Sequence, residues 1–295
     1  MERVHKAALP VYTASMWTAF KIFAFLCLCY AAIIVWMYFS QRKMLYYPKQ
    51  EMTAFPNDIG LMHENVWLIN RLGTRIHGWW LPHAAPRFTL LFSHGNGGNL
   101  SHRLDTLRIF HDLGLNVFAY DYSGYGQSLG DPSEEATAAD AHAAWDWLVQ
   151  EQDVSPESII LVGRSLGGAV TASLTAKLAN DSQTPAGLIM ESTFTSVPDM
   201  GAYMYPWLPV RLLARYQYDS ATNLTGLNLP VLFLHSPNDD IVPYALGRRL
   251  YNDYQGPKSF IELAGDHNSG FLTSGASYPE GLTHFLSSLE KDSDQ

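Results

Sequence analysis

The 295-residue chain is long enough for one large domain or two small ones, and an α/β fold commonly uses this length as a single domain. Six of the 19 basic residues and one of the 28 acidic residues fall within residues 1–50, so residues 51–295 hold 13 basic and 27 acidic residues, a net charge of −14. Because a polyphosphate requires a basic groove, this acidic part of the chain excludes nucleic acid as a partner.

The first predicted element is an apolar helix near the N-terminus. No charged residue occurs from Ile22 to Ser40, and this run gives about 28 Å of helix, close to the hydrocarbon thickness of a bilayer. We therefore predict an N-terminal tail over 1–16 and a transmembrane anchor over 17–41, which makes the chain a single-pass membrane protein. A cleaved signal peptide is the alternative, but the run continues well past the small residues at which cleavage would be expected.

Basic residues flank the apolar run on both sides, so the positive-inside rule leaves open which side of the membrane carries the rest of the chain. Both cysteines, Cys27 and Cys29, lie within the run, and the globular part has no thiol for a disulfide. We expect the two cysteines to pack as apolar side chains, with acylation as the alternative.

After the anchor, residues 42–62 are predicted to form a surface linker that leads into one globular domain over 63–295. The segments 65–70 and 75–82 alternate as β-strands do, and the turn between them contains Gly73. They predict a β-hairpin.

Six further runs predict strands: RFTLLFSHG, NVFAYDYSG, SIILVGRS, AGLIMES, PVLFLHSPND and KSFIELAGD. Helical spacing or composition occurs between them, at 100–113, 134–150, 166–178, 243–254 and 278–289. Most of the strands are too apolar to have one face in water, so they need helices on both sides. The pattern predicts an α/β fold with a mostly parallel, doubly covered sheet and an antiparallel hairpin at one edge. Ligands bind beyond the carboxyl ends of such strands.

The strand SIILVG runs into the sequence GRSLG, with Ser165 at its centre, and a helix follows. This is typical of a nucleophile elbow, a sharp turn that exposes the serine hydroxyl and requires small neighbours. At about 7% Gly and a similar share of Ser, G-x-S-x-G arises by chance in roughly one chain in ten of this length, so its place between strand and helix carries the prediction. The alternative role for Ser165 is a helix N-cap.

A serine nucleophile needs a base, and the base needs an acid that fixes its tautomer. Asp239 follows the strand VLFLHS, and His267 follows SFIELA. We predict a triad of Ser165, Asp239 and His267. Asp240 or Glu191 could supply the acid instead; Asp239 could cap the following helix, and His267 could be a surface loop histidine. Three other histidines are expected to be core or surface residues: His77, His235 and His284.

Acyl transfer also needs donors for the negative charge that develops on the substrate oxygen. The backbone N–H of Leu166 is one predicted donor, and Asn96 in the glycine-rich loop HGNGGN is the other. A phosphate-binding role for this loop would require a following Lys-Ser/Thr, which is absent from the sequence. Residues 121–126, DYSGYG, are expected to form a turn that lets adjacent loops pack. No cluster has the spacing of a metal site, and we predict no metal and no cofactor.

The motifs HGNGGN, DYSGYGQS, GRSLGG, DDIVP and GDHN closely resemble those of a membrane-anchored α/β-hydrolase domain family, the bacterial lysophospholipase-like hydrolases related to eukaryotic protein depalmitoylases. The resemblance covers nearly the whole chain, including an N-terminal hydrophobic helix followed by Tyr-Tyr-Pro. It implies the α/β-hydrolase fold, the same triad and oxyanion residues, and hydrolysis of an ester or thioester. Arg164 stands where many relatives have glutamine, and this puts none of these roles in doubt.

Residues 199–218 lie between two core strands and are rich in Met, Tyr, Trp and Leu. We expect a small apolar cap there, with Tyr203, Met204 and Trp207 binding substrate; the alternative is that the segment packs on the sheet or on the bilayer surface. An apolar cap beside a membrane anchor favours a lipid or an acylated protein as substrate over a soluble small molecule.

The function predicted from the sequence is hydrolysis of a carboxylic ester or thioester through an acyl-enzyme. An amidase or peptidase on the same fold is one alternative, because a triad does not choose between leaving groups. A non-catalytic membrane scaffold is the other. Dehalogenase chemistry would need a carboxylate at the position of Ser165.

Overall fold

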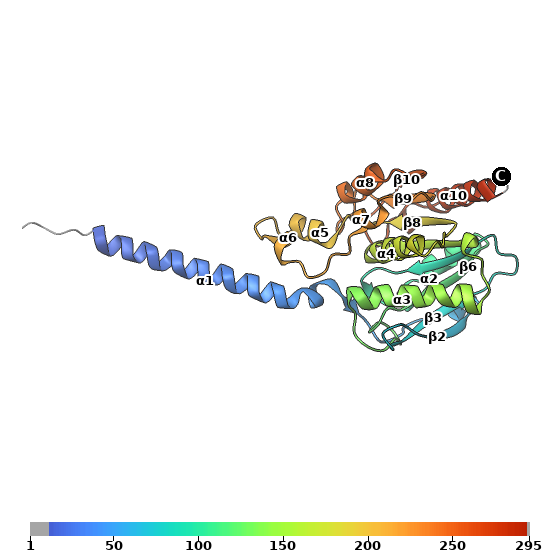
Figure 1. The fold of residues 1–295 in the computed structure, drawn as a ribbon, viewed down its shortest axis with the longest axis horizontal. Coiled ribbons are helices and arrows are strands. Elements are labelled where there is room, and N and C mark those ends of the chain that lie inside the picture. The colour runs from blue at the N-terminus through green and yellow to red at the C-terminus, as the bar shows by residue number, and fades with distance from the viewer. Residues whose placement is uncertain (1–11, 294–295) are drawn as a thin grey trace, which may run out of the picture. The chain divides into compact units, whose positions relative to one another are not determined.

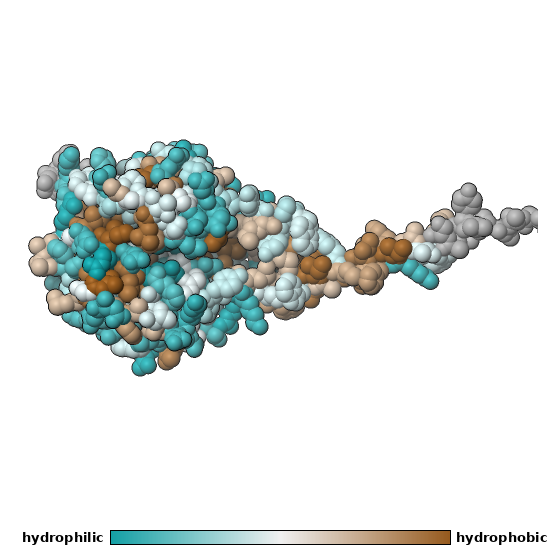
Figure 2. All heavy atoms as spheres, turned by 180° about the vertical axis from the view of Figure 1, so that it is seen from behind, coloured by the Kyte–Doolittle hydropathy of each residue, from teal (hydrophilic) through white to brown (hydrophobic). Residues whose placement is uncertain are grey.

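The computed structural model describes residues 12–293, which fall into two compact units with their boundary in the sequence between Gln41 and Arg42. Helix α1 begins at Tyr12 and ends at Leu45. Within its segment Met16–Leu45 the most apolar 18-residue window has a mean hydropathy of 2.4, and the segment is long and apolar enough to cross a membrane, a test that a signal sequence also passes. Its surface in Figure 2 is mostly pale to brown, whereas teal is widespread on the second unit. Of the tail predicted over 1–16, residues 1–11 lie outside the described residues.

The second unit is built on an eight-stranded sheet in the order β10-β9-β8-β7-β4-β6-β3-β2 (Figure 1). The strands are β2 (Glu64–Ile69), β3 (Arg75–Leu81), β4 (Thr89–Ser93), β6 (Asn116–Tyr120), β7 (Ile159–Arg164), β8 (Gly187–Glu191), β9 (Val231–His235) and β10 (Lys258–Glu262). The β2–β3 and β3–β6 pairs are antiparallel, and all the other neighbours are parallel. The predicted edge hairpin and mostly parallel sheet are therefore confirmed.

Helices cover both faces of this sheet. The longer ones are α2 (Leu104–Asp112), α3 (Glu134–Asp146), α4 (Leu166–Asn180), α8 (Tyr244–Asp253) and α10 (Ser277–Ser293). Successive strand residues point to opposite faces: Leu161 joins an apolar cluster with Trp145 of α3, and Val162 joins a second cluster with Phe110 of α2. Helices on both faces of the sheet were predicted from the apolar sequences of the strands. The helix expected over 134–150 differs at its end, because a π-helical turn replaces the α-helix after Asp146.

The segment expected as a surface linker, residues 42–62, is held against the domain near its start. Strand β1 (Tyr47–Pro48) pairs in parallel with β5 (Gly97–Gly98) as a separate two-stranded sheet. Tyr46 is 5% exposed, and its hydroxyl lies 2.7 Å from that of Tyr218. The chain is therefore fixed to the domain immediately after α1 ends.

The segment expected to form a cap, residues 199–218, lies between β8 and β9. It overlaps two short helices, α5 (Val197–Met204) and α6 (Val210–Leu213), which project from the body of the domain in Figure 1. Helix α7 (Ser220–Leu224) then returns the chain to the sheet.

Candidate functional site

Ser165 occupies a strained turn between β7 and α4. Its φ and ψ are 54° and −121°, a backbone conformation that a residue with a side chain rarely adopts. A Cβ added at Gly163 would collide with the carbonyl of Gly167, and one added at Gly167 would collide with the carbonyl of Ser93. The two glycines are thus needed for the close approach of helix α4 to the strands, and the turn has the form of a nucleophile elbow.

His267 and Asp239 are joined in the loops that follow β10 and β9. His267 Nδ1 lies 2.7 Å from Asp239 Oδ2, so Nδ1 carries the proton and Nε2 is left to act as a base. The other carboxylate oxygen accepts the backbone N–H groups of Ile241 and Val242, at 2.9 and 2.7 Å. Burial raises the pKa of the Asp239 carboxyl, but hydrogen bonds from His235 and His267 outweigh burial and hold that pKa below its usual range. The carboxylate is therefore ionised and fixed.

The two alternative acids are engaged elsewhere. Asp240 accepts the backbone N–H of His267 at 3.1 Å through Oδ1 and does not touch its ring. Glu191 is buried and lies 2.7 Å from the Nε of Arg164. Asp239 is thus the carboxylate that contacts the His267 ring.

Ser165 and His267 both follow the carboxyl ends of parallel strands, which places them at the same edge of the sheet. No hydrogen bond joins their side chains in the part of the chain that the structure describes. Catalytic hydrogen bonds are often long in a free enzyme and shorten when substrate binds.

His235 is a neighbour of the acid that the sequence did not identify. It is 1% exposed, and its Nε2 lies 3.0 Å from the carbonyl oxygen of Val242 and 3.3 Å from Asp239 Oδ2. Both neighbours are acceptors, so Nε2 carries the proton. Its place as the last residue of β9, four residues before Asp239, is the only sequence signal. Of the other histidines, His77 is buried, which lowers its pKa to about 4, and His284 is exposed.

The predicted oxyanion residues come from two separate segments of the chain. Leu166 is the first residue of α4, and Asn96 lies in the loop after β4. The side chain of Asn96 donates to the carbonyl of Leu45 at 2.9 Å, which leaves its backbone N–H as the donor available to a ligand. The carbonyl of Asn96 accepts the N–H of Tyr47 at 3.0 Å and the hydroxyl of Tyr125 at 2.7 Å. Two other parts of the chain therefore fix the plane of this peptide.

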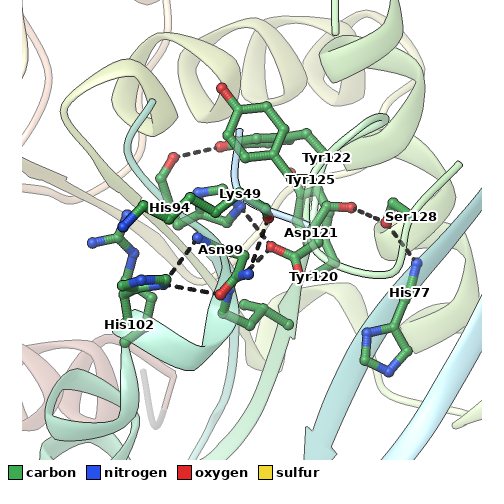
Figure 3. Close-up of polar contacts among 12 residues, drawn as sticks. Lys49, His77, His94, Asn99, His102, Tyr120, Asp121, Tyr122, Tyr125 and Ser128 are labelled. Carbon is green, nitrogen blue, oxygen red and sulfur yellow. Dashed lines mark hydrogen bonds and ion pairs between the residues drawn. The ribbon is translucent and has the colours of Figure 1, made fainter. Parts of the chain in front are cut away.

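Buried polar contacts hold the start of the same loop (Figure 3). His94 and Asp121 have no exposed side-chain surface, and His94 Nε2 lies 3.3 Å from Asp121 Oδ1. The ring of Tyr122 lies 4.4 Å from that of His94, and its hydroxyl donates to the His94 carbonyl at 2.7 Å. The turn expected over 121–126 does pack against the glycine loop, and its tyrosines provide the contacts.

The three residues predicted to bind substrate are open to solvent. Tyr203 is 67% exposed, and Met204 and Trp207 are each 54% exposed. A separate surface hollow lined by residues of β2 and α3 contains none of the predicted site residues. Within residues 12–293, no group of three or more His, Cys, Asp or Glu side chains could hold a metal ion.

Comparison with known families gives a matched region that includes Asn96, Ser165 and Leu166 and ends before Asp239 and His267. Residues 84–220 match the model for serine aminopeptidase, S33. An uncharacterized protein of Mycobacterium tuberculosis is 34% identical over 91% of this chain and 95% of its own length. The α/β-hydrolase domain-containing protein WAV2 of Arabidopsis thaliana is 33% identical over 83% of this chain and 87% of its own. The lysophosphatidylserine lipase ABHD12 of Danio rerio is 32% identical, over 55% of this chain and 46% of its own.

Solved structures share the fold at low identity. An esterase of Pyrococcus furiosus has a TM-score of 0.66 at 15% identity and covers 82% of this chain and 97% of its own. An α/β-hydrolase of Vibrio vulnificus has a TM-score of 0.64 at 20% identity, covering 80% and 82%.

Proposed function

The chain is a hydrolase of the α/β-hydrolase family, of the esterase and lipase type, and from this premise we propose that it cleaves carboxylic ester or thioester bonds through an acyl-enzyme. The observation that carries the proposal is the strained turn at Ser165, at the sheet edge where His267 is bonded to Asp239 at 2.7 Å. A serine is held at a positive φ in such a turn where its hydroxyl must be presented to a substrate.

In the proposed reaction the Ser165 hydroxyl oxygen attacks the acyl carbonyl while its proton passes to Nε2 of His267. The N–H groups of Asn96 and Leu166 receive the oxyanion. Collapse of the tetrahedral intermediate breaks the bond to the leaving oxygen or sulfur, which takes the proton from His267. Water then attacks the acyl-enzyme by the same route and releases the acid, and Asp239 stabilises the imidazolium in both steps. No cofactor takes part.

We propose a lipid or an acylated protein as substrate. The relative from Danio rerio is a lysophosphatidylserine lipase, and this chain combines an apolar cap over 199–218 with an apolar N-terminal helix. In this proposal the chain divides as the sequence predicts, with a single-pass anchor over 17–41 and a hydrolase domain over 63–295. The exposed cap residues Tyr203, Met204 and Trp207 contact the acyl chain.

An amide is the second candidate bond. The matched family model is described as a serine aminopeptidase, and the same triad could expel an amine. Side-by-side assays of matched ester, thioester and amide substrates distinguish these leaving groups.

The test is covalent labelling of the full-length protein by a fluorophosphonate, followed by hydrolysis assays over acyl chain lengths. We expect the Ser165→Ala variant not to take the label, and we expect its kcat to fall by at least about 10³-fold. The matched control is Ser173→Ala, another serine on α4, which should keep both. A folded parent protein that neither takes the label nor turns over any acyl substrate would contradict the proposal and favour a non-catalytic scaffold.

A further inference from the structure

The cap exposes four large apolar side chains. Leu212 is 88% exposed, Tyr203 is 67% exposed, and Met204 and Trp207 are each 54% exposed. They lie on α5, on α6 and in the turn between these helices, which project from the domain in Figure 1. We call these four residues the cap face. Soluble proteins seldom expose large apolar side chains together unless the surface binds a partner or a membrane.

Residues 199–218 contain two arginines and one acidic residue, a net charge of +1, whereas the domain as a whole is acidic. Asp199 is the only acidic residue within 199–218, whereas residues 51–295 carry a net charge of −14. Arg211 lies 2.8 Å and Arg249 3.3 Å from the carboxylate oxygens of Asp199, and Arg249 also lies 3.4 Å from Asp253. Arg215 adds a further positive charge to the segment. Basic side chains beside apolar ones suit a surface of anionic lipid headgroups.

The residue that follows helix α1, Tyr46, contacts the end of the cap segment. Tyr46 is buried, and its ring centroid lies 5.6 Å from that of Tyr216, four residues beyond Leu212. Only five residues lie between Tyr46 and Ser40, the last residue of the uncharged run, and the six steps along the chain span at most about 20 Å. If α1 spans a membrane, the chain leaves the bilayer close to the cap.

We propose that the cap face docks on the lipid bilayer beside the anchor, with its apolar side chains at the acyl boundary and its arginines at the headgroups. The docking itself does not depend on catalysis. One consequence rests on the proposed function: a docked cap would let an acyl chain pass from the bilayer toward Ser165 without crossing water.

Docking is tested on the full-length chain in vesicles of phosphatidylcholine with added phosphatidylserine. In a Cys27→Ser, Cys29→Ser background, Leu212→Cys carries an environment-sensitive fluorophore, and nitroxide-labelled lipids act as quenchers. The matched control is Ile69→Cys on edge strand β2, where the native side chain is apolar and 65% exposed. We expect several-fold stronger quenching at 212 than at 69.

Equal, weak quenching at both positions would overturn the proposal. So would a fluorescence change at 212 that follows protein density and ignores the nitroxide lipid, because that result identifies a second copy of the chain as the occupant.

The consequence for substrate entry has a separate test. Leu212→Glu should lower turnover of a long-chain ester embedded in vesicles several-fold and leave turnover of a short soluble ester unchanged. Equal losses on both substrates would contradict entry from the bilayer. A parent chain that hydrolyses neither ester would refute the proposed function, and the quenching result would still decide the docking.

Discussion

Arg164 connects the elbow to two other segments through contacts that could not be predicted from its position in the sequence. It directly precedes Ser165 and is 7% exposed. Its Nε lies 2.7 Å from Glu191, and its guanidinium stacks 4.2 Å from the ring centroid of Phe271, in the segment that follows His267. A planar guanidinium can bind a carboxylate and stack on a ring together, which glutamine and lysine cannot reproduce. Arg164 thereby joins the loops that carry the proposed nucleophile and base.

We expect the single substitution Glu191→Leu to lower the free energy of unfolding by about 3 to 5 kcal/mol, because it leaves the buried Arg164 without a carboxylate and the buried Tyr278 hydroxyl without its acceptor. Adding Arg164→Met should restore much of that loss. Denaturant unfolding of both single variants and the double variant measures the coupling. The exposed pair Lys177 and Asp181, 2.9 Å apart, is the control and should show coupling below about 1 kcal/mol. Additive losses at 164 and 191 would contradict this account.

Tyr125 is expected to position the oxyanion donor, since its hydroxyl donates to the Asn96 carbonyl at 2.7 Å. Tyr125→Phe should lower kcat roughly three- to tenfold with little change in KM, because a loosened donor weakens binding of the transition state more than that of the substrate. Steady-state kinetics on a soluble ester measures both constants. Tyr254→Phe removes a buried hydroxyl from a contact with Leu229 and should leave kcat unchanged. A change in KM alone would refute the positioning role.

Among the elements, the two-residue strand β1 connects the segment after α1 to the loop that contains Asn96. Its N–H at Tyr47 donates to Asn96 at 3.0 Å, and the next N–H along, at Lys49, donates to Gly98 at 3.1 Å. The side-chain amide of Asn99 donates a hydrogen bond to the Lys49 carbonyl at 3.0 Å. The segment that follows α1 and the loop of the proposed oxyanion donor therefore form one hydrogen-bonded unit.

Two substitutions at Tyr47 separate the backbone bond from the side chain. Tyr47→Pro removes the N–H that bonds Asn96, so we expect kcat on a soluble ester to fall about tenfold. Tyr47→Ala keeps the N–H and removes a side chain that is 56% exposed, so it should have nearly parental kcat. Equal kcat values for the two variants would show that the β1–β5 pairing does not matter for turnover.

At the scale of the whole molecule, the compact hydrolase unit begins at Arg42, ahead of the domain boundary expected at residue 63. A chain that starts at Arg42 keeps β1, and one that starts at Gln50 loses it. We expect the first to retain fluorophosphonate labelling and turnover of a soluble ester, and the second to lose most of its turnover even where it folds, as judged by circular dichroism. Equal activity of the two truncated chains would place the functional boundary after residue 50.

The sheet and its helical cover could be predicted because they depend on local patterns. The strands are short apolar runs, the helices have their own periodicity, and Gly163 and Gly167 mark the elbow through their lack of side chains. The apolar run of α1 is likewise a property of consecutive residues. The order of the strands in the sheet could not be predicted from local patterns. Strand β4 lies between β6 and β7, and these pairings join segments that are distant in the sequence.

Sequence by itself determined which residues could perform acyl transfer and in what order they follow the strands. Only the tertiary structure decided that Asp239, rather than Asp240 or Glu191, contacts the ring of His267, that His235 lies beside that carboxylate, and that β1 holds Asn96. Each of these is a contact between loops or strand ends. A side chain's partner there depends on how separate segments pack, and no local periodicity encodes it.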